Sequence, residues 1–230
     1  MINNSSNLEA IILCGGKGER LRPLTEQIPK PMVVIKKKPI LYYIINHLKN
    51  NKINKFKIAT GYKSEVVNDY LNKNHSNLNI KKIYSGDVDI IKRIQDACKY
   101  IKNDFLILYG DTISNVNISD LQKFNKVRDQ KSTITVWPMQ SQFGLVDFDK
   151  KLRVISFKEK PILDKYMNIG YFYFRRELIN KINRYKSWEI FLNDLVSERS
   201  INAFKHNGIH ITVNTIDELK EAEKNIGKII

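Results

Sequence analysis

Three apolar runs, each ending in a glycine turn, constrain the fold of this chain more than any other feature. The runs and the turns that follow them are 8–14 with Gly15-Gly16, 55–60 with Gly61, and 105–109 with Gly110-Asp111. Segments with helical spacing separate them, at residues 39–48, 64–71 and 90–101. Strands that alternate with helices in this way predict a largely parallel sheet with helices on both faces. Ligands bind beyond the carboxyl ends of such strands, so we expect the three turns to converge on one site.

The second half of the chain has a mixed pattern. Strand-like runs lie at 132–137, 152–157, 169–174 and 210–213. Helical spacing recurs at 118–125, 177–182, 188–196 and 216–225, and a capping signature, Thr215 with Glu218, opens the last of these. The chain has 230 residues, 42% of them hydrophobic, with no internal repeat and no linker, which fits one core. We therefore predict a single domain, residues 1–230, with an α/β, Rossmann-like, doubly wound and predominantly parallel mixed sheet.

The formal net charge of +15 is compatible with a nucleic acid, an acidic membrane surface or a phosphate-rich substrate. The lysines are spread along the whole chain, and no zinc-finger spacing, basic zipper or aromatic RNA-binding signature is present. This distribution favours a general compositional bias, and we predict no nucleic-acid partner.

The compartment is predicted from the apolar runs and the cysteines. No run approaches the roughly 20 residues of a membrane span, and the first residues lack the basic and apolar stretches of a secretory signal. Cys14 and Cys98 form no disulfide framework or metal-ligand spacing. We therefore expect a cytoplasmic protein with reduced cysteines and no membrane insertion, in which Cys14 packs in the core.

The segment from Leu13 to Met32 carries the sharpest chemical signal. Its glycines, Gly15, Gly16 and Gly18, follow a strand directly, and a loop without Cβ atoms lets backbone N–H groups approach phosphates. An ordinary strand-to-helix turn explains the glycines equally well. Arg20 and Lys30 shift the balance toward phosphate binding, because one offers a forked donor and the other a compact charge held between two prolines.

The run from Ala10 to Met32 resembles the N-terminal signature of the sugar-phosphate nucleotidyltransferases, which reads G-G-x-G-x-R-L, then L-T, then P-K-P-M. Further matches follow in order at 39–41, 60–63, 109–111, 157–161 and 168–170. The resemblance implies the nucleotide-diphospho-sugar transferase type of fold. It also implies an enzyme that joins a nucleoside triphosphate to a sugar phosphate and releases pyrophosphate, by in-line attack on the α-phosphorus.

The resemblance also implies roles for individual residues. Arg20, Lys30 and Asp111 would be catalytic: Arg20 would hold the leaving pyrophosphate, Lys30 would neutralise the reacting phosphates, and Asp111 would bind Mg²⁺. The nucleotide would contact Leu13, Gly15, Gly16, Gly18, Arg20, Gly86 and Asp87. The sugar phosphate would contact Lys30, Glu159, Lys160 and Asn168. For Glu159 and Lys160 the alternative without the resemblance is a solvated charge pair.

The stretch from Tyr84 to Ile94 looks closest to the glucose-1-phosphate cytidylyltransferase subgroup, which predicts CTP as the donor and a product used for a surface glycan such as capsule or lipopolysaccharide. Guanylyl, uridylyl or thymidylyl transfer remain alternatives, as does a binding module without catalysis. The acceptor is not determined by the sequence. Any homo-oligomer would form through this same domain.

Three departures from the family pattern bear on these predictions. The glycine pair expected before Arg93 is missing, and Asn168-Ile169-Gly170 replaces Asn-Gly-Gly, so the base pocket and the acceptor are expected to differ. Asn214 stands where the family has a second metal-binding aspartate. It would coordinate Mg²⁺ through its carbonyl oxygen without adding charge. Asp217 is predicted to be a first-turn helix charge and not a displaced ligand.

Overall fold

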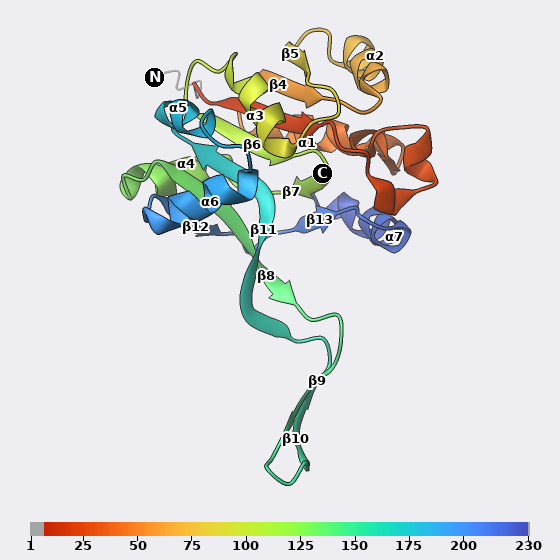
Figure 1. Ribbon diagram of the computed structural model, residues 1–230. Helices are drawn as coiled ribbons and strands as arrows, with labels where there is room; N and C mark the ends of the chain where they lie inside the picture. The colour runs from red at the N-terminus through yellow and green to blue at the C-terminus, as the bar shows by residue number, and fades with distance from the viewer. Residues whose placement is uncertain (1–6, 230) are drawn as a thin grey trace.

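The computed structural model describes residues 7–229, and a seven-stranded sheet forms its centre (Figure 1). The strands run in the order β12-β8-β11-β6-β1-β4-β5. Their bounds are β1 (Glu9–Cys14), β4 (Lys55–Thr60), β5 (Asn79–Tyr84), β6 (Phe105–Tyr109), β8 (Ser132–Gln140), β11 (Ile162–Phe174) and β12 (Ile201–Lys205). Strand β11 is antiparallel to both of its neighbours, and the other pairings are parallel. The predicted mixed, mostly parallel sheet is confirmed.

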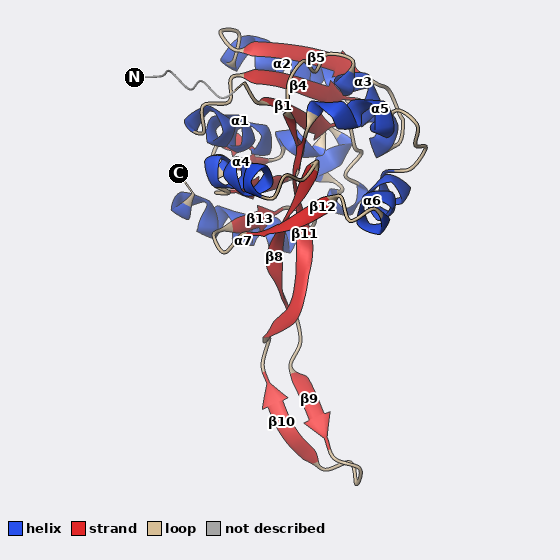
Figure 2. Cartoon of the chain, turned by 90° about the vertical axis from the view of Figure 1, so that its left-hand side faces the viewer, coloured by secondary structure: helices blue, strands red, loops and turns tan. Residues whose placement is uncertain are grey.

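Helices cover both faces of the sheet (Figure 2). One face carries α1 (Ile40–Asn50), α2 (Ser64–Asn74), α4 (Ile118–Val127) and α7 (Ile216–Asn225), and the other carries α3 (Ile90–Cys98), α5 (Ile179–Ile182) and α6 (Trp188–Ser197). Successive side chains of a strand point to opposite faces, so Ile12 of β1 packs into the first layer and Ile11 into the second. Both are fully buried, and each such side chain stabilises the fold by about 1.5–3 kcal/mol.

The predicted elements match the structure best where an apolar run or a cap defines them. The strands at 55–60 and 105–109 and the helix at 216–225 have the predicted bounds. Strands β5 and β12 were not predicted. Both lie at the edges of the sheet, and β5 carries Lys81 and Lys82 in place of a continuous apolar run. Charged side chains are typical of exposed edges, which hides such strands from a search for hydrophobic runs.

Short strand pairs support the loops around the sheet. Strands β2 (Val34–Ile35) and β3 (Lys38–Pro39) form one pair, and β7 (Thr112–Ser114) and β13 (His210–Thr212) form another. The second pair joins the chain just after Gly110-Asp111 to the segment that leads into α7. No helix among the described residues is both long and apolar enough to cross a membrane.

Strands β8 and β11 continue beyond the body of the molecule and carry a projecting hairpin (Figure 1). This hairpin, residues 141–161, is called the arm below. It contains β9 (Leu145–Phe148) and β10 (Val154–Lys158), the second of which lies within two residues of the predicted strand at 152–157. Val146 pairs with Phe157, and Phe148 pairs with Val154, so the four side chains share one face. All four are exposed.

Candidate functional site

The three glycine turns meet at one edge of the sheet, as their position after parallel strands predicts. Gly110 N donates to Leu13 O (3.0 Å), and Tyr62 N donates to Gly15 O (3.2 Å). The contact is tight, because a Cβ atom at Gly61 would lie 2.6 Å from Gly86 O and 2.9 Å from Gly15 O. Glycine is therefore required at Gly61 for the backbone turns to approach one another.

A cavity of about 580 Å³ opens at this edge. Its wall contains all but one of the predicted nucleotide-binding residues, namely Leu13, Gly15, Gly16, Gly18, Arg20 and Asp87. It also contains Lys30, Asp111 and Asn214. Gly86 does not line the wall, and its backbone oxygen lies close to Gly61. Residues up to 201 positions apart in the sequence, Leu13 and Asn214, thus line one cavity.

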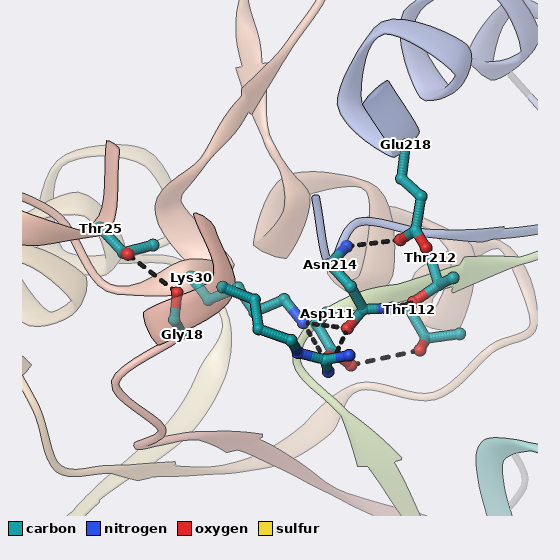
Figure 3. A network of polar contacts seen from close by, with 9 residues as sticks. Gly18, Thr25, Lys30, Asp111, Thr112, Thr212, Asn214 and Glu218 are labelled. Carbon is teal, nitrogen blue, oxygen red and sulfur yellow. Dashed lines mark hydrogen bonds and ion pairs between the residues drawn. The ribbon is translucent and has the colours of Figure 1, made fainter. Parts of the chain in front are cut away.

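The side chains of Lys30, Asp111 and Asn214 point toward one another (Figure 3) and line the cavity. With Arg20 they form a cluster of two cations and two side chains that accept through oxygen. The Lys30 ammonium forms an ion pair with the Asp111 carboxylate and donates to Asn214 Oδ1 (2.8 Å). Arg20 Nη2 donates to the same Asn214 oxygen (2.9 Å). The side chain of Lys30 is 12% exposed and that of Asp111 is 28% exposed, so their charges attract each other more strongly than at an open surface.

The loop before Lys30 fixes the position of this lysine. Pro29 is extended, and Lys30 begins a short 3-10 turn at Lys30–Met32. Gly18 adopts a positive φ of 66°, and a Cβ atom there would lie 3.1 Å from Lys30 Cβ. Thr25 Oγ1 donates to Gly18 O (2.9 Å) and closes the loop between them. The glycine-rich loop therefore lies directly against the lysine.

The start of α7 fixes Asn214 from the other side. Asn214 Nδ2 donates to Thr212 Oγ1 (3.0 Å), which turns Oδ1 toward Lys30 and Arg20. Asn214 N donates to Glu218 Oε2 (2.6 Å), and Glu218 N donates to Thr215 Oγ1 (3.2 Å). The predicted cap of α7 is confirmed. Sequence reasoning identified Glu218 only as a cap residue, whereas the structure shows that it also holds Asn214.

The three remaining predicted sugar-phosphate residues do not line the cavity. Glu159 and Lys160 lie in the arm, where Lys160 O accepts from Gln140 Nε2 (2.9 Å), and both are exposed. Asn168 is an exposed residue of β11, and its Oδ1 accepts from Gly170 N (2.8 Å). The structure does not bring Glu159 and Lys160 to Lys30 and Asp111. Strands β8 and β11 extend away from the body, and Glu159 and Lys160 lie in the arm that they carry (Figure 1). Their role stays a prediction.

The structure places the side chain of Ile169 outside the cavity wall, and its expected effect on the acceptor stays a prediction. Ile169 is 2% exposed and packs in the layer that contains α1. The glycine that the backbone requires is Gly170, which has a φ of 72° and whose Cβ atom would lie 2.6 Å from Tyr109 Cδ2. The branched side chain therefore enters the core and does not reach the cavity.

Sequence reasoning treated Arg93 only as a marker of a subgroup, but the structure places it in the wall of the cavity. Arg93 lies in the first turns of α3 and is 6% exposed. Its Nη2 donates to Gly15 O (3.2 Å) and to Gly86 O (3.1 Å). The signal for this residue was a cation near a helix N-terminus, where the helix dipole disfavours positive charge.

The structure also bears on the predictions for Cys14 and Asp217. Burial raises the pKa of the Cys14 thiol well above its usual value, so this cysteine packs and does not act as a nucleophile. Asp217 pairs with Lys220 (3.2 Å) in the first turn of α7, as predicted. Among residues 7–229, no group of three histidine, cysteine, aspartate or glutamate side chains could hold a metal ion.

Comparisons with known proteins find matches along most of this chain. The family described as Nucleotidyl transferase matches residues 9–229. The chain is 36% identical to the bifunctional protein GlmU of Methanocaldococcus jannaschii over 94% of this chain, and 32% identical to the D-glycero-alpha-D-manno-heptose 1-phosphate guanylyltransferase of Campylobacter jejuni over 75% of it. It is 30% identical to the glucose-1-phosphate cytidylyltransferase of Salmonella typhimurium over 91% of this chain.

The matched lengths differ among these relatives. The chain spans about half (54%) of the length of the Methanocaldococcus protein, 78% of the Campylobacter protein and 92% of the Salmonella protein. Among solved structures, HddC from Yersinia pseudotuberculosis superposes with a TM-score of 0.76 at 24% identity, covering 95% of this chain and 99% of that one. This likeness shows the fold.

Proposed function

This chain belongs to the nucleotidyl transferase family, and from that premise we propose that it joins a nucleoside triphosphate to a sugar phosphate and releases pyrophosphate. The observation that carries the proposal is the meeting of Arg20, Lys30, Asp111 and Asn214 beside the glycine loop. Two cations and a glycine-rich backbone are suited to several phosphate groups. A site for an uncharged ligand would not need them.

In the proposed reaction a phosphate oxygen of the sugar phosphate attacks the α-phosphorus of the nucleotide. The new bond joins this oxygen to the α-phosphorus, and the bond from the α-phosphorus to the bridging oxygen breaks. The electron pair leaves with pyrophosphate. Lys30 neutralises charge where the two phosphates meet, and Arg20 holds the leaving group, so catalysis rests on position and electrostatics.

A magnesium ion fits the oxygen donors of this site. The carboxylate of Asp111 and the amide oxygen of Asn214 already face one cation, the Lys30 ammonium. Carboxylate and carbonyl oxygens together with substrate phosphates are the ligands that Mg²⁺ prefers. Asp111 and Asn214 would hold the ion, which when bound supplies neutralisation of phosphate charge.

We propose CTP as the nucleotide. Support comes from the loop around Gly86 and Asp87, which looks like that of the cytidylyltransferases, and from the identity with the Salmonella glucose-1-phosphate cytidylyltransferase over most of both chains. The similarity to a heptose phosphate guanylyltransferase makes GTP the alternative donor. We further propose that the reaction takes place in the cytoplasm and that its product serves surface-glycan synthesis, with no nucleic acid involved.

A nucleotide panel tests the proposal. Thermal midpoints are measured with Mg²⁺ and each of CTP, GTP, UTP, dTTP and ATP, and pyrophosphate release is then followed with a set of sugar 1-phosphates. We expect the largest stabilisation with CTP, and a ligand at about 100 times its Kd raises the free energy of unfolding by about 2.7 kcal/mol. Stabilisation without pyrophosphate release from any acceptor would instead indicate a binding module. If GTP alone stabilised the protein, GTP would replace CTP as the proposed donor.

A further inference from the structure

The arm carries an apolar surface that the described part of the chain leaves exposed. The pairing of β9 with β10 brings four exposed side chains to one face, namely Val146, Phe148, Val154 and Phe157. Leu152 in the turn and Ile155 at the irregularity in β10 extend this surface, and both are exposed. Apolar side chains that gather on a surface mark a place where a protein meets a membrane or another protein.

The two faces of the arm differ in character. On the face opposite the apolar one, Leu145 pairs with Lys158 and Asp147 pairs with Ser156, so three of these four side chains are polar or charged. The same division into an apolar and a polar face places amphipathic segments at the boundary between water and lipid. Strands β8 and β11 hold the arm away from the body (Figure 2), so it can reach such a boundary while the cavity stays in water.

The turn of the arm is basic. Lys150 and Lys151 lie between β9 and β10, both are exposed, and neither belongs to an ion pair within residues 7–229. The neighbouring carboxylate of Asp149 is already satisfied, because it accepts from Lys151 N (2.8 Å) and pairs with Arg153 (2.7 Å). The two ammonium groups are therefore available to anions from outside the chain.

Leu152 lies beside these lysines in an unusual conformation. Its φ is 61°, in the left-handed region where glycine or asparagine is the usual residue of a turn. A leucine strains the turn and is not compensated by burial, since Leu152 is 76% exposed. The residue type is explained if an apolar environment outside the chain receives this side chain.

Charge and area decide between a membrane and a second copy of the chain. A second copy has the same basic turn and the same net charge of +15, so two arms repel each other, whereas an anionic leaflet attracts both the turn and the body. The apolar face offers on the order of 400 Å², about half of the roughly 800 Å² per partner that a standard protein interface buries. Lysines beside apolar side chains can extend their ammonium groups to lipid phosphates.

We propose that the arm docks on an anionic membrane leaflet, with its apolar face and Leu152 in the interfacial layer and with Lys150 and Lys151 at the lipid phosphates. The contact is peripheral and needs no spanning segment. It differs from the sequence-based expectation of no membrane insertion, because the apolar face forms only when β9 and β10 pair. Docking is separate from the proposed reaction and does not depend on it.

Vesicle sedimentation tests the proposal on the full chain. The protein is mixed at physiological ionic strength with vesicles of phosphatidylcholine alone, or of phosphatidylcholine and phosphatidylglycerol in equal parts. We expect partition onto the anionic vesicles to be at least about tenfold stronger than onto the neutral ones, and to fall as the salt concentration is raised. Equal partition onto both kinds of vesicle, or none onto either, would overturn the proposal.

Two pairs of lysine substitutions locate the contact. Lys150→Gln with Lys151→Gln leaves the apolar pairing intact, and we expect partition onto anionic vesicles to weaken at least about tenfold. Lys81→Gln with Lys82→Gln removes the same charge from two exposed neighbours on β5, and this control should partition within about twofold of wild type. An equal loss in both variants would show that the net charge and not the arm binds lipid, which would reject the proposal.

Phe148→Ser with Phe157→Ser tests the apolar face. We expect partition onto anionic vesicles to fall at least about tenfold, while the thermal midpoint shows that the body stays folded. Unchanged partition would contradict the role of this face. Sedimentation equilibrium without vesicles tests the other occupant, because a wild-type dimer that these two substitutions dissociate would show that a second copy covers the face and would overturn the proposal.

Discussion

The cavity edge and the arm both contain residues of the sequence motifs, but the fold joins those at the edge by contacts and leaves those in the arm exposed. At the edge, Lys30, Asp111 and Asn214 come from three distant segments and are joined by hydrogen bonds and an ion pair. In the arm, Glu159 and Lys160 are adjacent in sequence and exposed. Residues that are distant in the sequence meet where parallel strands end. Residues that are adjacent in the sequence, such as Glu159 and Lys160, lie wherever their hairpin lies.

The two regions also differ in what holds them. The edge lies against a doubly covered sheet whose central strands are buried on both faces. The arm is a two-stranded sheet with an exposed apolar face made of Val146, Phe148, Val154 and Phe157. An isolated pair of strands is marginal in water. Geometry at the edge is therefore firmly set, while that of the arm depends on few contacts.

Replacement of Lys30 is expected to have the largest effect. Lys30→Met removes the cation between Asp111 and Asn214, and we expect pyrophosphate release to fall about 10²–10³-fold, as for loss of one electrostatic donor in a transition state. The measurement is kcat/KM for the nucleotide with its thermal midpoint. Lys49→Met, at an exposed site on α1, should retain full activity. If Lys30→Met kept full activity, the cluster at this edge of the sheet would not be the catalytic site.

Acidification should lower the free energy of unfolding of the body, because His47 and His210 lie there and not in the arm. Burial lowers the pKa of His47 and of His210 to about 4, from 6.5. Between these values the unfolded chain binds more protons than the folded protein, so stability present at pH 7 is lost as the pH falls toward 4. We expect about 1–2 kcal/mol per histidine between pH 7 and pH 5. Thermal melts at pH 7, 6 and 5 measure it, and a flat profile would contradict the burial of both rings.

Asn214→Asp should raise the affinity of the cavity edge for Mg²⁺. A second carboxylate beside Asp111 adds ligand charge, and we expect the Mg²⁺ concentration for half-maximal activity to fall about tenfold. A magnesium titration of pyrophosphate release gives this value. Asn77→Asp, at an exposed position, provides the control. An unchanged titration would show that Asn214 serves Arg20 and Lys30 alone.

Removal of the arm is expected to have the smallest effect on stability. Gln140 and Ile162 are paired across β8 and β11, so residues 141–161 can be replaced by an Asn-Gly turn. We expect the thermal midpoint to stay within about 2 °C, which corresponds to about 1 kcal/mol or less. A larger fall would show that the arm supports the body.

The same variant decides the role of Glu159 and Lys160. A rise in KM for the sugar phosphate, with nucleotide binding unchanged, would mean that the arm reaches the cavity by bending or from a second copy. An unchanged KM would remove both residues from the site.

The sequence by itself determined the strands that end in glycine, the cap of α7, and the meeting of Gly15, Lys30 and Asp111 at one cavity. These features follow from local rules, because a buried strand needs an apolar run and a parallel sheet collects its strand ends at one edge.

Only the tertiary structure decided where Arg93, Ile169, Glu218 and the arm lie. Arg93 donates to the backbone oxygen of Gly15, which lies 78 residues earlier in the chain. Glu218 accepts from the backbone N–H of Asn214, which lies four residues earlier. Ile169 turns into the core because its neighbour Gly170, with φ 72°, takes the strained position beside Tyr109. The arm leaves the body because β8 and β11 stay paired beyond the sheet. Such outcomes depend on packing between segments, which spacing along one chain does not encode.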